Sequence, residues 1–67
     1  MNINIREYIK NNFIDSSIDD IKLSIETSIK EKEELVLPGL GVFFEILWIN
    51  SDENFKQDIL NIIKKNL

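Results

Sequence analysis

Apolar residues recur at three- and four-residue spacing along three parts of this 67-residue chain. Such spacing places them on one face of an amphipathic helix. The predicted faces are Ile5, Tyr8, Ile9 and Phe13; then Ile18, Ile21, Ile25 and Ile29; and finally Phe55, Ile59, Ile62 and Ile63. Serines precede the last two segments, and we expect Ser17 and Ser51 to be N-caps, because a hydroxyl can accept from free amides of the first turn.

The third segment, LPGLGVFFEILW at residues 37–48, has a less regular pattern. As a helix it places large apolar residues at i, i+3, i+4, i+7 and i+8, and Pro38 then suits the first turn, where its missing N–H loses nothing. As a strand it is apolar on both faces, which requires a sheet covered on both sides. The period therefore favours a helix, although two helical glycines, Gly39 and Gly41, cost about 1 kcal/mol each relative to alanine.

These patterns predict one all-α domain over residues 1–67, a small bundle of four short helices with the third helix at its centre and covered by the others. The expected helices span about 3–14, 17–33, 38–50 and 52–66. The alternative is an α+β fold with a hairpin around 34–49, which turns at Gly39–Gly41 in a topology like that of histone-like proteins.

Composition removes most catalytic chemistry. The chain has no cysteine and no histidine, so it offers no disulfide, no thiolate or imidazole ligand and no imidazole base. No serine has a base at motif spacing, and the glycines of P-G-L-G lack the Lys-Ser/Thr of a phosphate loop. We therefore expect no enzyme activity, no metal or other cofactor, and no small-molecule substrate.

The charge distribution bears on partners and location. The net charge is −4, and residues 1–37 carry five cations against eight acids, whereas the remainder carries three against four. Because binding to a phosphate backbone requires clustered Lys and Arg, nucleic acid is disfavoured. The longest apolar run is too short to span a membrane, and residues 1–15 lack signal-peptide order. We expect a cytoplasmic protein, or one in a compartment derived from the cytoplasm.

Glu45 is the single acid within the third segment, and it has two interpretations. It either points outward through a narrow polar stripe that includes Gly41, which we favour, or it is a partly buried carboxylate with a raised pKa or a partner's cation beside it. Its i±4 neighbours are Gly41 and Ile49. Any cation that pairs with it must therefore come from another segment or another chain.

The aromatic residues of the third segment are candidates for either core or interface. We expect Phe44 and Leu47 to be core, and we leave both possibilities open for Trp48, which with Phe43 and Glu45 forms our candidate interaction set. A helix this apolar on all sides is difficult to cover with three thin amphipathic helices. We therefore expect a homodimer.

This sequence resembles the type I small acid-soluble spore proteins of endospore-forming bacteria over essentially its whole length, most clearly in two stretches. The chain opens MNINIR, and its central block has the family's pattern. The matching block residues are Leu37, Pro38, Gly39, Leu40, Gly41, Val42, Phe44, Glu45 and Trp48. The connecting DSSIDD departs from the turn expected for the family, and the chain ends early, at Leu67.

The resemblance implies a minor protein that is made in the forespore and kept in the spore core, where other spore-core proteins are further candidate partners. The resemblance thus implies where and when the protein is present, but it implies no molecular mechanism and no DNA binding. A weaker resemblance links residues 40–43 to histone-like DNA-bending proteins, and a nucleic-acid-associated spore protein is accordingly the alternative function. The basic β-arm of those proteins is missing here.

Overall fold

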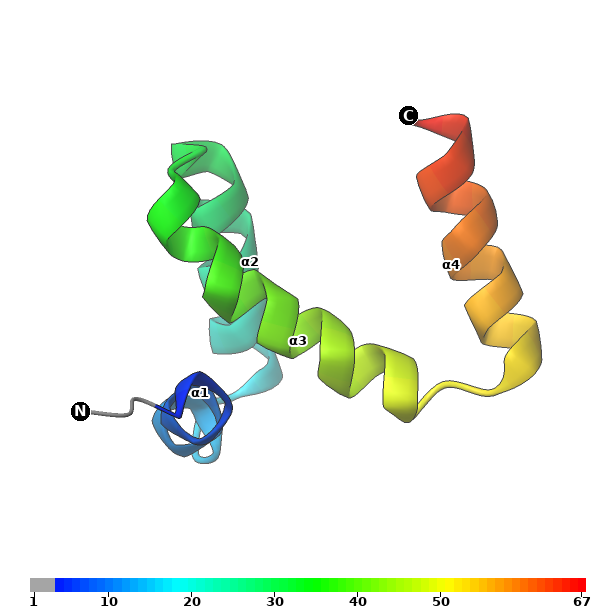
Figure 1. The fold of residues 1–67 in the computed structure, drawn as a ribbon. Coiled ribbons are helices and arrows are strands. Elements are labelled where there is room, and N and C mark those ends of the chain that lie inside the picture. The colour runs from blue at the N-terminus through cyan, green and yellow to red at the C-terminus, as the bar shows by residue number, and fades with distance from the viewer. Residues whose placement is uncertain (1–3) are drawn as a thin grey trace.

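The computed structural model describes residues 4–67 and has four α-helices and one short 3₁₀-helix (Figure 1). The elements are α1 (Ile5–Phe13), α2 (Ile18–Glu31), η1 (Glu34–Val36), α3 (Leu37–Ile49) and α4 (Glu53–Lys65). The all-α prediction is confirmed, and each observed helix lies within about two residues of its predicted bounds, except that residue 3 is outside the described part. The hairpin alternative is wrong, because residues 34–49 form η1 and α3 instead of paired strands.

The first two helices begin at polar caps. Asn4 Oδ1 accepts from the Glu7 amide at 3.1 Å, and Ser17 Oγ accepts from the Asp20 amide at 3.1 Å. Each oxygen satisfies an amide that has no partner within its helix. The predicted cap at Ser17 is confirmed.

The predicted cap at Ser51 is wrong, because Asp52 caps α4. The backbone of Asp52 is extended, and its carboxylate accepts from the Phe55 amide at 2.8 Å. Ser51 belongs to the end of the preceding helix, where its hydroxyl donates to the Leu47 carbonyl oxygen at 2.5 Å. Two adjacent residues therefore serve two helix ends: Ser51 satisfies an unpaired carbonyl of α3, and Asp52 satisfies an unpaired amide of α4.

Helix α3 is the centre of the packing, as predicted. Helices α1 and α2 and the short η1 all pack against it. Among residues 4–67, Val42 of α3 is the one buried hydrophobic residue, at 7% exposure. Nearby, the rings of Phe13 and Phe43 meet edge to face, with centroids 5.1 Å apart.

Gly39 lies where α1 packs against the first turns of α3. A Cβ placed there would lie 3.4 Å from Ile9 Cδ1, at the limit of ordinary contact. A side chain at this position would therefore contact α1, but the distance does not by itself require a glycine there. Among the described residues, Gly41 has no such neighbour within 4 Å, so close approach of another segment in residues 4–67 does not account for it.

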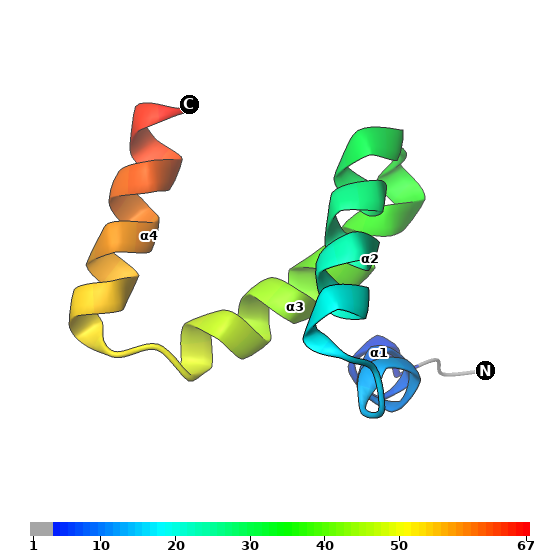
Figure 2. The ribbon, with the colours of Figure 1, turned by 180° about the vertical axis from the view of Figure 1, so that it is seen from behind.

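Helix α4 lies apart from the rest of the molecule. In both views it stands away from α1 and α2 and is joined to them through α3 (Figures 1 and 2). The radius of gyration is 13.3 Å, whereas a compact domain of this length has about 11 Å. The expectation that all three other helices cover α3 is therefore wrong for α4. None of the helices described is long and apolar enough to cross a bilayer.

Candidate interaction surface

Helices α1, α2 and α3 enclose an open apolar groove with a volume of about 840 Å³. Its walls are isoleucines, leucines and phenylalanines, with Lys10 and Asn50 as the polar lining residues. We call this feature the apolar groove; its apolar lining is Ile9, Phe13, Ile14, Ile21, Ile25, Leu40, Phe43, Phe44, Ile46, Leu47 and Ile49. No residue of α4 lines it.

Phe44 and Leu47 lie at the open side of the groove. Each remains 43% exposed, so the prediction that both are core residues is wrong. The reason is the position of α4, which would have to lie over this side of α3 to bury them and does not. The two residues expected to be hidden are therefore among those that the fold leaves available for contact.

Phe43 and Trp48 are half-buried, and both already have intramolecular contacts. Phe43 packs on Phe13 of α1. Trp48 stacks on Phe44 with ring centroids 5.9 Å apart, and Lys56 Nζ of α4 lies 5.3 Å from its ring centroid. Trp48 thus sits at the junction of α3 and α4, and its role as an interaction residue stays a prediction.

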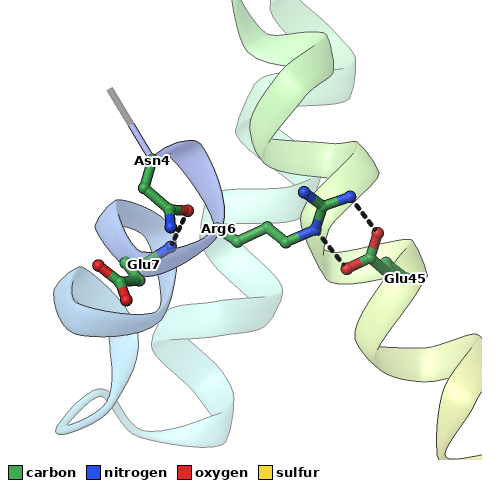
Figure 3. A network of polar contacts seen from close by, with 4 residues as sticks. All are labelled: Asn4, Arg6, Glu7 and Glu45. Carbon is green, nitrogen blue, oxygen red and sulfur yellow. Dashed lines mark hydrogen bonds and ion pairs between the residues drawn. The ribbon is translucent and has the colours of Figure 1, made fainter. Parts of the chain in front are cut away.

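Glu45 faces α1 and binds Arg6 with both carboxylate oxygens (Figure 3). Arg6 Nε donates to Oε1 at 2.7 Å, and Nη2 donates to Oε2 at 2.9 Å. The Glu45 side chain is 42% exposed, so it is neither a buried carboxylate nor an unpaired one. Its partner comes from another segment, as the absence of an i±4 cation required.

This pairing sets the protonation behaviour of both groups. The hydrogen bonds from Arg6 lower the pKa of Glu45, partial desolvation opposes the shift, and the charges of Arg6 and Lys10 add to it. The same contact raises the pKa of Arg6. Because the carboxylate stays ionised, it serves as an acceptor that ties α1 to α3, and the raised pKa considered for a buried Glu45 is not found.

Arg6 was not among the site residues predicted from the sequence. Its signal was indirect: Arg6 lies off the apolar face of its own helix, and Glu45 has no cation on its own helix. Which of Arg6 and Lys10 would reach Glu45 depends on how α1 crosses α3, which helical spacing alone does not give.

The predicted block residues divide by position. Pro38 is in the first turn of α3, where its ring starts the helix without losing a hydrogen bond. Gly39 faces α1, whereas Gly41 is exposed and meets open space. In residues 4–67 no group of three or more acidic side chains is arranged to hold a metal ion. The site is therefore an apolar contact surface, with Lys10 and Asn50 as its polar residues.

Comparison with known protein sequences identifies the family to which this chain is similar. The sequence of residues 3–67 matches the family described as small, acid-soluble spore protein I. Proteins of that name from Bacillus cytotoxicus and Bacillus mycoides are each 39% identical to this chain over 67 residues. The match covers 100% of this chain and 96% and 97% of theirs. One from Bacillus anthracis is 37% identical, with 97% of its length covered.

No solved structure matches this chain. The family match extends over almost all of its length, and the resemblance carried by residues 37–48 is confirmed. This chain belongs to the small, acid-soluble spore protein I family.

Proposed function

We propose that this protein is a non-enzymatic minor protein of the spore core, made in the forespore, and that it acts through self-association. Membership of a spore-protein family supports the setting. The observation that carries the mechanism is the apolar surface that the single chain leaves open, above all at Phe44 and Leu47 in the apolar groove.

The accessible surface of the chain is larger than that of a typical folded monomer of the same mass. The chain exposes 6069 Å², whereas a folded monomer of this mass exposes about 4,400 Å². The surplus is about 1,650 Å², and the three residues before Asn4 account for about 500 Å² of it at most, the area of three residues of unfolded chain. A surplus of this size on a chain that exposes many large hydrophobic residues is uncommon in a monomer, and association with a second copy is a common way to cover such residues.

Sedimentation velocity and light scattering across a wide concentration range test this proposal. We expect the native chain to associate at micromolar concentration and the variant Leu47→Asp to remain monomeric, because a charge in the apolar groove costs far more than a charge in water. The matched control is Leu23→Asp, which places the same charge on the exposed side of α2, outside the groove. A native chain that stays monomeric at every concentration would exclude self-association.

The arrangement of charge gives less support to the alternative, a nucleic-acid-associated protein. Lys30 and Lys32 lie at the end of α2, but the same stretch holds three glutamates, so it is not basic. Lys64 and Lys65 lie at the far end of α4. We expect no electrophoretic shift of duplex DNA even at low salt, where electrostatic binding is strongest. A shift that weakens steeply with added salt would favour the alternative.

A further inference from the structure

We propose that two chains associate by exchanging their last helix, so that α4 of each protomer lies in the apolar groove of its partner. This inference rests on the proposed self-association and specifies its form. Each chain supplies one groove and one helix, and a two-fold arrangement satisfies both at once. The occupant of the groove is therefore a segment of a second copy of this chain.

Helix α4 has the surface that such a groove accepts. Its apolar residues Phe55, Ile59, Ile62 and Ile63 recur at i, i+4, i+7 and i+8, the anchor spacing of a helix that docks in a groove. Phe55 is 48% exposed and Ile62 57% exposed, and α4 is not among the helices that pack extensively within the chain. Within the described residues 4–67, the amphipathic face of α4 is therefore left largely uncovered.

The dimensions of the two parts correspond. Helix α3 forms the floor of the apolar groove, and it has 13 residues, as has α4. Both are therefore about 20 Å long. A helix of that length can contact the groove from end to end and cover Phe44 and Leu47, which α1 and α2 leave open.

The junction between α3 and α4 favours a partner's groove over the chain's own. Asn50 Nδ2 donates to the Ile46 carbonyl oxygen at 2.8 Å, Ser51 closes the same helix end, and Asp52 caps α4 directly afterwards. Lys56 Nζ then lies over the Trp48 ring and 3.5 Å from Glu53 Oε1. Folding α4 back over its own α3 would have to change the backbone at residues 50–52, between these two closed helix ends, and would displace Lys56 from Trp48, whereas exchange leaves both as they are.

The exposed area agrees with exchange. A stable interface of standard size buries about 800 Å² on each partner. The surplus area of this chain exceeds that value even after the three N-terminal residues are allowed for. Exchange brings together two apolar surfaces that the single chain leaves exposed, the groove of one chain and the α4 face of the other.

Charge favours helix-in-groove contact over the direct pairing of two grooves. Residues 1–50 carry nine acids and five cations, whereas residues 51–67 carry three of each. Placing two acidic bodies face to face brings like charges together. Docking α4 instead brings a neutral segment, with Lys64 and Lys65 in its last turn, against the acidic body of the partner.

Isotope-filtered NMR on an equimolar mixture of ¹³C-labelled and unlabelled chains tests the exchange directly. We expect intermolecular contacts between the methyl groups of Ile59 and Ile62 and the Phe44 ring, and none from the Leu23 methyls. Intermolecular contacts between grooves without α4 would overturn the exchange and leave self-association standing. Contacts between α4 and the groove found only within one chain would also overturn the exchange, and a monomer would remove the proposed function as well.

A pair of matched variants provides an independent readout. Ile62→Asp places a charge on the apolar face of α4, whereas Asn61→Asp places the same charge on the opposite face. We expect Ile62→Asp to weaken association on the order of a hundredfold, because two equivalent side chains lose their cover, while Asn61→Asp changes it little. Circular dichroism should show equal helicity for both variants. Equal association of Ile62→Asp and the native chain would overturn the exchange.

Discussion

Helices α3 and α4 have the same length but differ in the local sequence signals that favour a helix. Helix α4 has a carboxylate cap at Asp52, an acid in its first turn and lysines in its last. Helix α3 begins without a side-chain cap, has no acid in its first turn and contains both glycines of the chain. Nevertheless α3 is the centre of the packing, whereas α4 packs least.

The comparison separates two sources of helical structure. Caps, charges near the helix ends and a regular apolar period favour a helix wherever it lies, and α4 has all three. Helix α3 depends on contacts with α1 and α2, which must offset about 1 kcal/mol for each glycine. Changes that remove tertiary contacts should therefore affect α3 most, and changes that remove local signals should affect α4 most.

Replacing Phe43 by Ala should have the largest effect on the single chain. Phe43 packs edge to face on Phe13, and its removal leaves a gap between α1 and α3. A fully buried Phe→Ala change costs about 3–5 kcal/mol, so we expect about 2 kcal/mol for this half-buried ring. Urea unfolding followed by circular dichroism, at a concentration below that of association, measures the loss.

The control for Phe43→Ala is Phe55→Ala, the same change on α4. Phe55 is 48% exposed, so at the same low concentration we expect a loss of no more than about 1 kcal/mol. Equal losses for the two variants would mean that α4 packs as firmly in the single chain as α3 does, and the contrast between the helices would disappear.

Replacing Asp52 by Ala tests the local side of the comparison. The Phe55 amide then loses its acceptor, and we expect a cost of about 1 kcal/mol confined to α4. Native-state hydrogen exchange should show faster exchange of the first-turn amides of α4 and unchanged exchange in α1 and α2. Ser51→Ala is the control, and it should leave those amides unchanged, because Ser51 closes α3 instead.

The sequence predicted all four helices. Helices α1, α2 and α4 have a regular apolar period, and a strand in place of α3 would be apolar on both faces, which requires a sheet covered on both sides. It also predicted that α3 is central, since the most apolar segment has most to gain from burial. It placed the start of α4 one residue early, because Ser51 and Asp52 are both good caps and only the backbone conformation distinguishes them.

The tertiary arrangement was harder to predict. Burial of Phe44 and Leu47 was expected because an apolar period shows which face is apolar but not whether another element covers it. The partner of Glu45 was missed because Arg6 is 39 positions away in the chain, and the crossing of α1 over α3 decides the pairing. The patterns of the sequence thus predict the helices and their apolar faces. They do not predict that the turn at residues 50–52 directs α4 away from the groove, which leaves one side of the groove open.

Replacing Gly41 by Ala should strengthen the helix with the poorer local signals. A Cβ at this position meets no atom of residues 4–67 within 4 Å, so we expect the helix propensity alone to change. We expect a gain of about 0.5–1 kcal/mol in the free energy of unfolding. Gly39→Ala is the comparison: its Cβ meets Ile9 Cδ1 at 3.4 Å, so its gain should be smaller. A loss of stability in Gly41→Ala would show that the open space is filled in solution.

The smallest expected effect concerns the contact between Arg6 and Glu45, which ties α1 to α3; in the part of the chain that the structure describes, no such ion pair joins α4 to another helix. The folded chain holds the pKa of Glu45 below its ordinary value near 4.5, because Arg6 donates two hydrogen bonds to the carboxylate. A lowered pKa in the folded state means that the unfolded chain binds the proton more tightly. The stabilisation from this group is therefore complete above about pH 4.5 and is lost as the pH falls through the folded value.

The variant Glu45→Gln should remove this pH dependence. At neutral pH we expect it to be slightly less stable than the native chain, since the exposed pair contributes little and is screened by salt. As the pH falls below about 4.5, the difference should shrink, because the native carboxylate then becomes protonated as well. Thermal unfolding between neutral and acid pH measures this convergence, with Glu26→Gln on the exposed side of α2 as the control. A difference that stays constant with pH would mean that Glu45 acts through its shape, and α1 would then be held on α3 by apolar contacts alone.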